Sequence, residues 1–362
     1  MDAAAKAIAP GAIVNVRGED GRGFGTGYFN PKSLIAVRLL AEDCDAAIGQ
    51  DFFAERLARA LKLRDSLYGK PFYRLVHAEG DHLPGLVVDR FGDTLTVQIG
   101  TAGMEKQRGA ILAALDQLLS PATVILRGDA PSRALEGLDS YVETVKGKGH
   151  RIAVEENGAR YIADLTEGQK TGWYYDQRDN RAFIAQFAKG KSVLDAYSYT
   201  GGFGILAATA GARETVCLDS SAPALALAEE SARANGVKIK PVKADVFEEL
   251  ERLVGASEKF DIVLADPPPF VKSKRDLEPG AKAYRKLARL AAQVTAPDGI
   301  LMLASCSHNI PPDRFATECA QGLLRAGRRA RLIRQAGAGP DHPVHPLLPE
   351  SAYLKALVYA LD

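Results

Sequence analysis

Acidic residues end or follow three short strand-like runs in the second half of this 362-residue chain. Asp195 ends the run 192–195, Asp219 ends the run 215–219, and Asp245 follows the run 240–243. In an open α/β sheet, ligands bind at the carboxyl ends of the strands, and an acid about 20 residues after the first strand accepts hydrogen bonds from ribose hydroxyls. Asp219 stands 24 residues after Asp195 and fits that role, while Asp245 is placed to meet an adenine amino group. These acids predict a nucleoside-bearing cofactor.

The segment 192–203, SVLDAYSYTGGF, predicts a strand, a tight glycine-containing loop and a helix over 204–210. It matches neither G-x-x-x-x-G-K-[ST] nor the full G-x-G-x-x-G, so it is a poor pyrophosphate site. NAD fits the spacing of the acids, but S-adenosylmethionine needs no phosphate cradle and fits the loop better. We expect further cofactor contacts from the loop and from the ends of the next two strands, at Tyr197, Ser198, Thr200, Gly201, Phe203, Ser220 and Val246.

A fourth acid, Asp266, ends the run 261–266 and is followed by three prolines and Phe270. Proline fixes φ and cannot donate a backbone hydrogen bond, so this run forms a rigid wall beside the ligand. A polar residue before Pro-Pro and an aromatic residue is how many nucleic-acid methyltransferases grip a flipped base. We therefore predict that Asp266 contacts both cofactor and substrate, with substrate contacts also from Pro267, Pro268, Phe270 and Lys272.

Cys306 lies between Ser305 and Ser307 at the end of the next run, 299–305. A lone cysteine is usually a small buried hydrophobic residue, but this one falls at the same sheet edge as Asp266. Methylation at C5 of a pyrimidine requires a nucleophile that adds at C6 and makes C5 electron-rich. Cys306 is the candidate nucleophile, and Asp266 is placed to hydrogen-bond the N3/N4 edge. We interpret Cys44, Cys217 and Cys319 as structural, and no zinc spacing is present.

Strands and helices alternate from residue 191 onward, which predicts a doubly wound, mostly parallel α/β sheet of the Rossmann-like methyltransferase class. Seven strands are expected, with helices that include 222–235, 247–253, 281–295 and 313–326. Before it we predict a short β-rich module over 1–68 with strands over 12–17, 25–29 and 34–40 and a helix over 51–67. A small α+β domain over 69–167 is expected to hold a helix over 103–119, and the residues 156–158 predict a hairpin turn. The third domain, 168–362, opens on a polar and aromatic segment, 168–181, in which Asp179 is the expected cap of a helix over 179–188.

The formal net charge is only +1, which gives no overall bias towards nucleic acid. Two stretches are locally basic: residues 271–289 hold seven Lys/Arg against two acids, and residues 321–335 hold five Arg and no acid. Each stretch could track a phosphate backbone or simply be a solvated helix face. No secretory signal or membrane-length apolar run is found, so we expect a cytoplasmic protein.

Several motifs resemble the class I S-adenosylmethionine-dependent ribosomal RNA methyltransferases of the RlmI type, which make 5-methylcytosine in large-subunit rRNA. The matching runs are Gly168–Gly172 (GQKTG) with Asp176-Gln177-Arg178, Ser198–Phe203 (SYTGGF), Asp266-Pro267-Pro268 with Phe270, Ser305-Cys306-Ser307 and Asp341-His342-Pro343.

The resemblance implies three parts, a PUA RNA-binding domain, a central α/β domain and the catalytic domain, with Cys306 as the nucleophile. It also implies that Gln177 and Arg178 join the three strand-end acids around S-adenosylmethionine and that rRNA is the substrate. Members of this family are often homodimers. The family usually has more chain, including a basic and aromatic stretch, before the equivalent of Ala12, so we expect a short PUA domain. Pro269 stands where relatives often have Lys, so no catalytic lysine is assigned there.

Three other functions remain open from the residues alone. An RNA methyltransferase that acts on a nitrogen uses the lone pair of the base and needs no thiol. An RNA-binding assembly factor would keep the fold without turnover, against which the strand-end acids and Cys306 argue. A nicotinamide oxidoreductase is disfavoured by the first loop.

Overall fold

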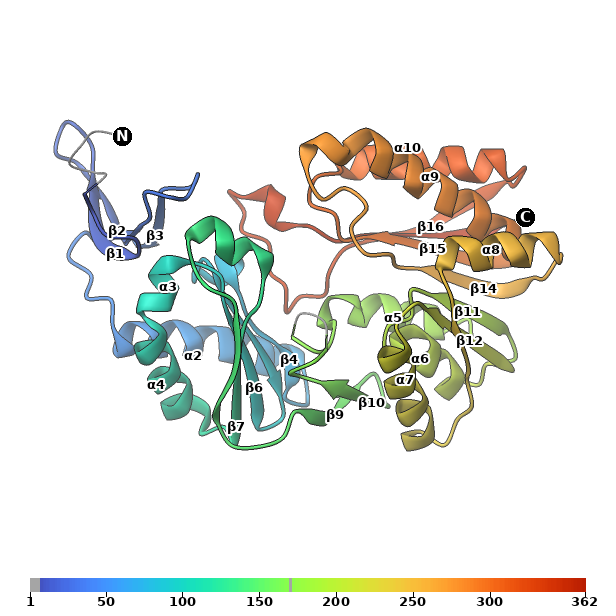
Figure 1. Cartoon of the computed structure of the whole chain (residues 1–362), viewed down its shortest axis with the longest axis horizontal. Helices are drawn as coiled ribbons and strands as arrows, with labels where there is room; N and C mark the ends of the chain where they lie inside the picture. Colours follow the sequence, from blue (N-terminus) through green and yellow to red (C-terminus); the bar gives the residue numbers. More distant parts are fainter. Residues whose placement is uncertain (1–6, 169–170) are drawn as a thin grey trace. The chain divides into compact units, whose positions relative to one another are not determined.

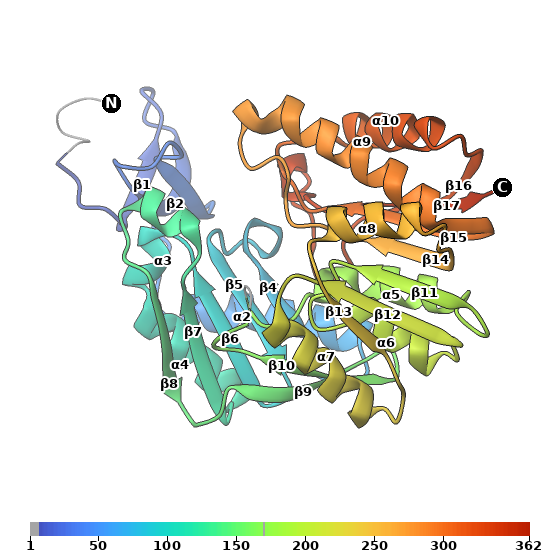
Figure 2. The ribbon, with the colours of Figure 1, turned by 45° about the vertical axis from the view of Figure 1, so that its right-hand side comes forward.

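The computed structural model describes residues 7–168 and 171–362, so Gln169 and Lys170 of the expected motif lie outside the described residues. The chain forms two compact units (Figures 1 and 2). The first lies within residues 1–152, 164–175 and 340–351, and the second within residues 153–163, 176–339 and 352–362. The predicted three-domain boundaries stay a prediction. Over the described ranges, none of the helices has the length and apolar character needed to cross a membrane.

The second unit is built on a seven-stranded sheet with the order β13-β12-β11-β14-β15-β17-β16. The chain moves outward from β11 to β13 and then returns to the other side of β11 at β14. This reversal is the switch point at which such sheets bind ligands. Only β17 runs antiparallel to its neighbours. The strands are β11 (Ser192–Ala196), β12 (Glu214–Asp219), β13 (Lys240–Lys243), β14 (Phe260–Ala265), β15 (Thr295–Ser305), β16 (Ala330–Ala336) and β17 (Lys355–Leu361).

Helices cover both faces of this sheet, with α8, α9 and α10 on one face and α5, α6 and α7 on the other (Figure 1). Every residue of β11 is buried, as expected for a parallel strand covered on both faces. Successive side chains point to opposite faces, so Leu194 packs in the core with α8–α10 and Val193 in the core with α5 and α6. The helices are α5 (Arg178–Ala185), α6 (Gly202–Thr209), α7 (Ala222–Ala234), α8 (Val246–Gly255), α9 (Leu277–Val294) and α10 (Pro312–Arg325).

The first unit holds a three-stranded antiparallel sheet and a five-stranded sheet with the order β4-β5-β6-β7-β8. The small sheet comprises β1 (Ala12–Arg17), β2 (Gly23–Phe29) and β3 (Val37–Ala41), and the larger one comprises β4 (Phe72–His77), β5 (Leu86–Phe91), β6 (Thr94–Ile99), β7 (Thr123–Gly128) and β8 (Tyr141–Lys146). Helices α2 (Gln50–Leu67) and α4 (Arg108–Leu119) share one apolar core with the larger sheet. Helix α2, which we expected within the module over 1–68, therefore packs on the five-stranded sheet.

Three local predictions differ from the structure. The helix expected over 103–119 is two helices, α3 (Ala102–Lys106) and α4, separated at Gln107, whose φ and ψ of −92° and 6° are not helical. The cap expected at Asp179 is wrong, because α5 begins at Arg178 and Gln177 holds the cap position. The strand expected over 34–40 begins at Val37. The turn predicted at 156–158 is confirmed, because it joins β9 (Arg151–Glu156) to β10 (Ala159–Asp164).

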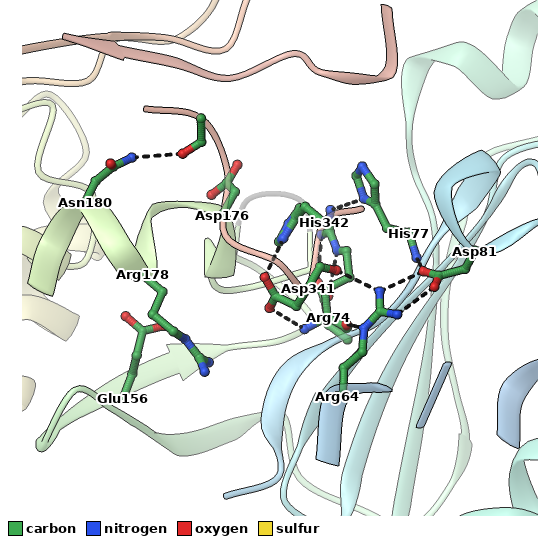
Figure 3. A network of polar contacts seen from close by, with 12 residues as sticks. Arg64, Arg74, His77, Asp81, Glu156, Asp176, Arg178, Asn180, Asp341 and His342 are labelled. Atoms are coloured by element: carbon green, nitrogen blue, oxygen red, sulfur yellow. Dashed lines mark hydrogen bonds and ion pairs between the residues drawn. The ribbon is translucent and has the colours of Figure 1, made fainter. Parts of the chain in front are cut away.

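A buried ionic cluster in the first unit centres on Arg64 of α2 (Figure 3). The Arg64 guanidinium donates to both carboxylate oxygens of Asp81 at 2.6 and 2.7 Å, and to the carbonyl oxygens of Arg74 and Asp341 at 2.9 and 2.8 Å. The Asp341 carboxylate in turn accepts the Arg74 backbone N–H at 3.0 Å. The Asp341-His342-Pro343 motif therefore fastens the late segment 340–351 to α2 and β4, a role the sequence did not reveal.

We expect Arg64→Ala to lower the free energy of unfolding by about 3–5 kcal/mol, because it leaves the carboxylate of Asp81 buried and unpaired. Urea-induced unfolding followed by circular dichroism measures this change. The matched control is Arg59→Ala on the same helix, since Arg59 and its partner Glu55 are 69% and 62% exposed and such pairs contribute at most about 1 kcal/mol. Equal losses in the two variants would contradict the assignment of Arg64 as the anchor.

Candidate cofactor and catalytic site

The loop after β11 is fastened by carboxylates from two neighbouring strands. Asp195 Oδ2 accepts the backbone N–H of Gly204 at 2.8 Å, and Asp219 Oδ2 accepts that of Tyr199 at 2.9 Å. Tyr197 and Tyr199 have φ values of 62° and 49°, in the left-handed region that non-glycine residues seldom adopt. Strained backbone of this kind persists only where surrounding contacts enforce it, and it clusters at ligand sites.

Two hydroxyl groups of this loop are buried without a hydrogen-bond partner in the part of the chain that the structure describes. They are Ser198 Oγ and Thr200 Oγ1, on either side of Tyr199. A buried polar group without a partner costs about 1–3 kcal/mol, so such a pair indicates a missing ligand. The amino-acid and ribose groups of S-adenosylmethionine supply suitable partners, and the residues present fit this cofactor.

Asp195 lies at the base of the loop and is almost fully buried. Burial raises its pKa to about 7; the Gly204 N–H opposes this, and the charges of Asp266 and Asp219 add to it. Because the charges of Asp266 and Asp219 both raise the pKa of Asp195, these three strand-end acids lie near one another at one sheet edge. Gly204 is required at this contact, because a Cβ there would lie 2.6 Å from the Cys217 sulfur.

The other predicted cofactor residues take several positions around this edge. Asp219 also accepts the Ser221 N–H at 2.8 Å, so both its oxygens are engaged by backbone. Asp245 is exposed and caps α8 by accepting the N–H groups of Phe247 and Glu248. Ser220 is exposed, whereas the side chains of Val246 and Phe203 are buried in the core. Gly201 has a φ of 79° and is the N-cap residue of α6. Their contacts with the cofactor stay predictions.

Gln177 and Arg178, at the start of α5, point to different partners. Gln177 Nε2 donates to Asp266 Oδ2 at 2.9 Å, and its Oε1 accepts from Asn180 Nδ2 at 2.7 Å, which orients the amide. Arg178 Nε contacts Glu156 Oε2 at 3.3 Å, at the hairpin of β9 and β10 (Figure 3). Gln177 therefore joins the Asp266 strand end, whereas Arg178 holds α5 to the hairpin.

The candidate nucleophile lies beside the proline wall. Cys306 Sγ is 4.0 Å from the carbonyl oxygen of Pro267, so the carboxyl ends of β15 and β14 meet as predicted. The Cys306 side chain is half-buried, whereas Cys217 and Cys319 are fully buried and burial raises the pKa of both thiols. Of these three thiols, the one at the sheet edge is the most accessible to a substrate.

Tyr284 of α9 ties the Ser305-Cys306-Ser307 turn to the wall. Its hydroxyl lies 2.8 Å from the side-chain oxygens of both Ser305 and Ser307, and it is 3.5 Å from the Phe270 N–H. The Phe270 ring packs against Tyr284 with ring centres 4.8 Å apart, so it lies against the apolar core on that face of the sheet. The predicted substrate residues Pro268 and Lys272 are exposed, and Pro267 is buried.

Sequence reasoning missed three residues of this site: Tyr284, Asn180 and Lys355. Tyr284 and Asn180 look like ordinary buried helix positions. The serine partners of Tyr284 lie at the end of another element, whereas Asn180 contacts Gln177 three residues before it. Lys355 did carry a signal, because it is a lone charge within the otherwise apolar run 354–358. Among residues 7–168 and 171–362, no group of three His, Cys, Asp or Glu side chains is arranged to hold a metal ion.

The chain resembles known proteins over nearly its whole length. It matches the S-adenosylmethionine-dependent methyltransferase family over residues 91–359 and a PUA-like domain over residues 1–42. Curated relatives from Shewanella denitrificans and Aeromonas salmonicida, each named Ribosomal RNA large subunit methyltransferase I, are 38% identical over 356 residues, 96% of this chain and 90% of theirs.

Two solved structures share the fold. A protein from Streptococcus mutans described as a SAM-dependent methyltransferase superposes with a TM-score of 0.84 at 22% identity, over 97% of this chain and 92% of that chain. A methyltransferase complexed with SAH, SMU.776, gives 0.85 at the same identity and coverage. The predicted fold class is therefore confirmed.

The sheet order, the strained loop and the family match define an S-adenosylmethionine-dependent methyltransferase, and the predicted cofactor is confirmed. The chain belongs to the family of ribosomal RNA large subunit methyltransferase I.

The raised pKa of Asp195 predicts a pH-dependent stability. Between about pH 4 and pH 7 the folded chain keeps a proton that the unfolded chain has lost, so this carboxyl destabilises the fold progressively as pH rises through that window. We expect Asp195→Asn to remove this loss. The melting temperature of unliganded Asp195→Asn minus that of wild type should be more positive at pH 8 than at pH 5. Differential scanning fluorimetry measures both temperatures.

The control for Asp195→Asn is Glu214→Gln, which removes an exposed carboxylate at the start of β12. If the two variants showed the same pH dependence, burial of Asp195 would not be the cause.

Proposed function

We propose that this protein methylates C5 of a cytosine in large-subunit rRNA, with Cys306 as the covalent nucleophile and S-adenosylmethionine as the methyl donor. The observation that carries this proposal is the position of the Cys306 thiol, half-buried and 4.0 Å from the Pro267 carbonyl at the edge where the strand-end acids converge. Nitrogen methylation would use the lone pair of the base and would leave this thiol without a task.

The substrate class rests on the relatives and on the N-terminal segment. The relatives are named for the RNA of the large ribosomal subunit, and residues 1–42 match a PUA-like domain. The exposed Pro268 and Lys272 beside Asp266 offer contacts to an RNA base and its phosphate. These features support RNA as the substrate.

Bound S-adenosylmethionine supplies a methyl group on a sulfonium sulfur, which leaves as the neutral thioether. The Cys306 thiolate forms a bond with C6 of the cytosine, and the electron pair of the C5–C6 double bond is then available at C5 to form the bond to the methyl carbon. Asp266, oriented by Gln177, hydrogen-bonds the N3/N4 edge and stabilises the adduct. Loss of the C5 proton to a base restores the double bond and expels the thiolate.

We expect Cys306→Ala to abolish methyl transfer, by at least about a thousandfold, because no other group supplies the bond to C6. The assay is transfer from labelled S-adenosylmethionine to unmodified large-subunit rRNA, followed by nucleoside analysis. RNA that contains 5-fluorocytosine, from which the C5 substituent cannot leave as a proton, should trap a covalent complex with wild type and none with Cys306→Ala.

The control variant is Cys44→Ala, which removes a half-buried thiol of the first unit and should retain full transfer. Calorimetric titration with S-adenosylmethionine verifies that Cys306→Ala still binds the cofactor. Label in a nucleoside other than 5-methylcytosine that persists in Cys306→Ala would overturn the C5 mechanism in favour of nitrogen methylation.

A further inference from the structure

Four cations of the first basic stretch and one of the second line a single surface depression in the second unit. The depression has a volume of about 430 Å³, and five cationic side chains line it: Lys282, Arg285, Lys286, Arg289 and Arg325. The first four lie on α9 and come from the stretch 271–289, and Arg325 ends α10 in the stretch 321–335. Arg289 and Arg325 are 36 positions apart in the sequence and line the same depression, which we also call the hollow.

The four α9 cations form a single stripe along the helix. Their spacing of i, i+3, i+4 and i+7 places them on one face, over about 10 Å at the ~1.5 Å rise per residue. The substrate wall that ends at Phe270 is joined to α9 by residues 271–276, which add Lys272, Lys274 and Arg275. The basic stretch is therefore continuous along the chain between the wall and the stripe on α9.

Nearby acids neutralise only part of this charge. Arg285 contacts the buried carboxylate of Glu318 at 2.6 Å, and Lys286 contacts Glu251 at 2.9 Å. Arg289 donates to the neutral amide of Gln293 at 3.1 Å. Lys282 and Arg325 form no ion pair with a described residue. Three cations of the hollow are thus available to an anionic ligand.

We infer that this depression binds the phosphate groups of the RNA strand that flanks the target nucleotide. The inference rests on the proposed function, and it assigns a task to the basic stretches that the chemistry at Cys306 does not use. A hollow lined only by cations suits a polyanion, since each phosphate neutralised releases counterions and strengthens binding.

The test variant replaces Lys282, Arg289 and Arg325 with Ala together. Arg285 is left in place, because its removal would disturb the buried carboxylate of Glu318. The control variant replaces Arg233, Lys238 and Lys240, three exposed cations near β13, and so changes the net charge equally. Fluorescence anisotropy measures the affinity of wild type and both variants for an unmodified large-subunit rRNA transcript over a range of salt concentrations.

We expect the test variant to bind at least about tenfold more weakly at 0.15 M salt, with a shallower dependence of log affinity on log salt, because a slope of about 0.9 is lost per phosphate contact. S-adenosylmethionine binding and the control variant should match wild type. Unchanged RNA affinity, or equal losses in both variants, would overturn the inference while wild type still methylates rRNA. Failure of wild type to bind or methylate rRNA would instead overturn the proposed function, and this inference with it.

A second, independent observation concerns Lys355 of β17. This lysine is buried, and its Nζ donates to the carbonyl oxygens of Ser307 at 2.6 Å and Ile310 at 3.2 Å. β17 pairs with β15 so that Lys355 lies opposite Ser305. The backbone of Lys355 thus lies beside Ser305, and its ammonium group contacts Ser307, the two residues that flank Cys306. In the described residues this ammonium group forms no ion pair with a carboxylate.

We propose that Lys355 is a positioning residue that holds the thiolate form of Cys306 ready for attack. A positive charge beside a thiol favours the thiolate, which is the nucleophile. Burial lowers the pKa of Lys355, and the charge of Cys306 opposes this, which shows that the two groups interact. Among the described residues, other ionisable groups near the turn are Asp266, His308 and the hydroxyls of Tyr284 and Tyr353. The carbonyl oxygen of Lys272 accepts a hydrogen bond from Asn309, and its side chain is exposed.

The experiment measures the pH dependence of Cys306 alkylation by iodoacetamide, read by mass spectrometry of the Cys306 peptide. Lys355→Met removes both charge and hydrogen bonds, and Lys355→Gln keeps a donor without the charge. We expect the alkylation midpoint to move to higher pH by about one unit in both variants, and the pH profile of methyl transfer to move with it. Lower activity with unchanged midpoints would reduce Lys355 to a structural role and overturn the proposal.

Discussion

The site depends on the burial of negative charge at the switch point of a parallel sheet. β11, β12 and β14 end at one edge, and their carboxylates at Asp195, Asp219 and Asp266 act on one another. Asp195 has almost no contact with solvent, so the first turn of α6 must approach closely enough for Gly204 to donate to it. That approach forces the intervening loop into left-handed backbone and leaves two hydroxyls buried for a ligand.

The reactive edge is assembled from elements that are distant in the chain. Cys306 ends β15, the proline wall follows β14, and Tyr284 of α9 joins the two through the serine hydroxyls. The reversed strand β17 adds Lys355 opposite Ser305. An antiparallel strand inserted between β15 and β16 thus gives the parallel sheet a cation at an edge otherwise populated by acids.

Each unit also carries cationic groups with distinct tasks. In the first unit, the fully buried Arg64 donates hydrogen bonds to Asp81 and to two carbonyl oxygens, and so holds a late segment of the chain against α2. In the second, Arg285 is fixed by Glu318, whereas Lys282 and Arg325 remain open to a ligand. The difference lies in burial, because a buried cation must be paired while an exposed one remains available.

Much of the fold and of the site followed from local pattern. The alternation of short strand-like runs with helical segments located the strands of the second unit. The glycine loop, the Asp-Pro-Pro wall and the Ser-Cys-Ser turn lie at one sheet edge as their strand-end positions required, because parallel strands align their carboxyl ends. The sequence could not place Tyr284, Lys355 or the Arg64 cluster. The Lys355 contact spans 48 residues and the Arg64–Asp341 contact 277, so only the packing of remote elements brought those partners together. For the same physical reason, the sequence showed two basic stretches but not that Arg325 of the second lines one depression with four cations of the first, since helix packing alone decides which charges share a face.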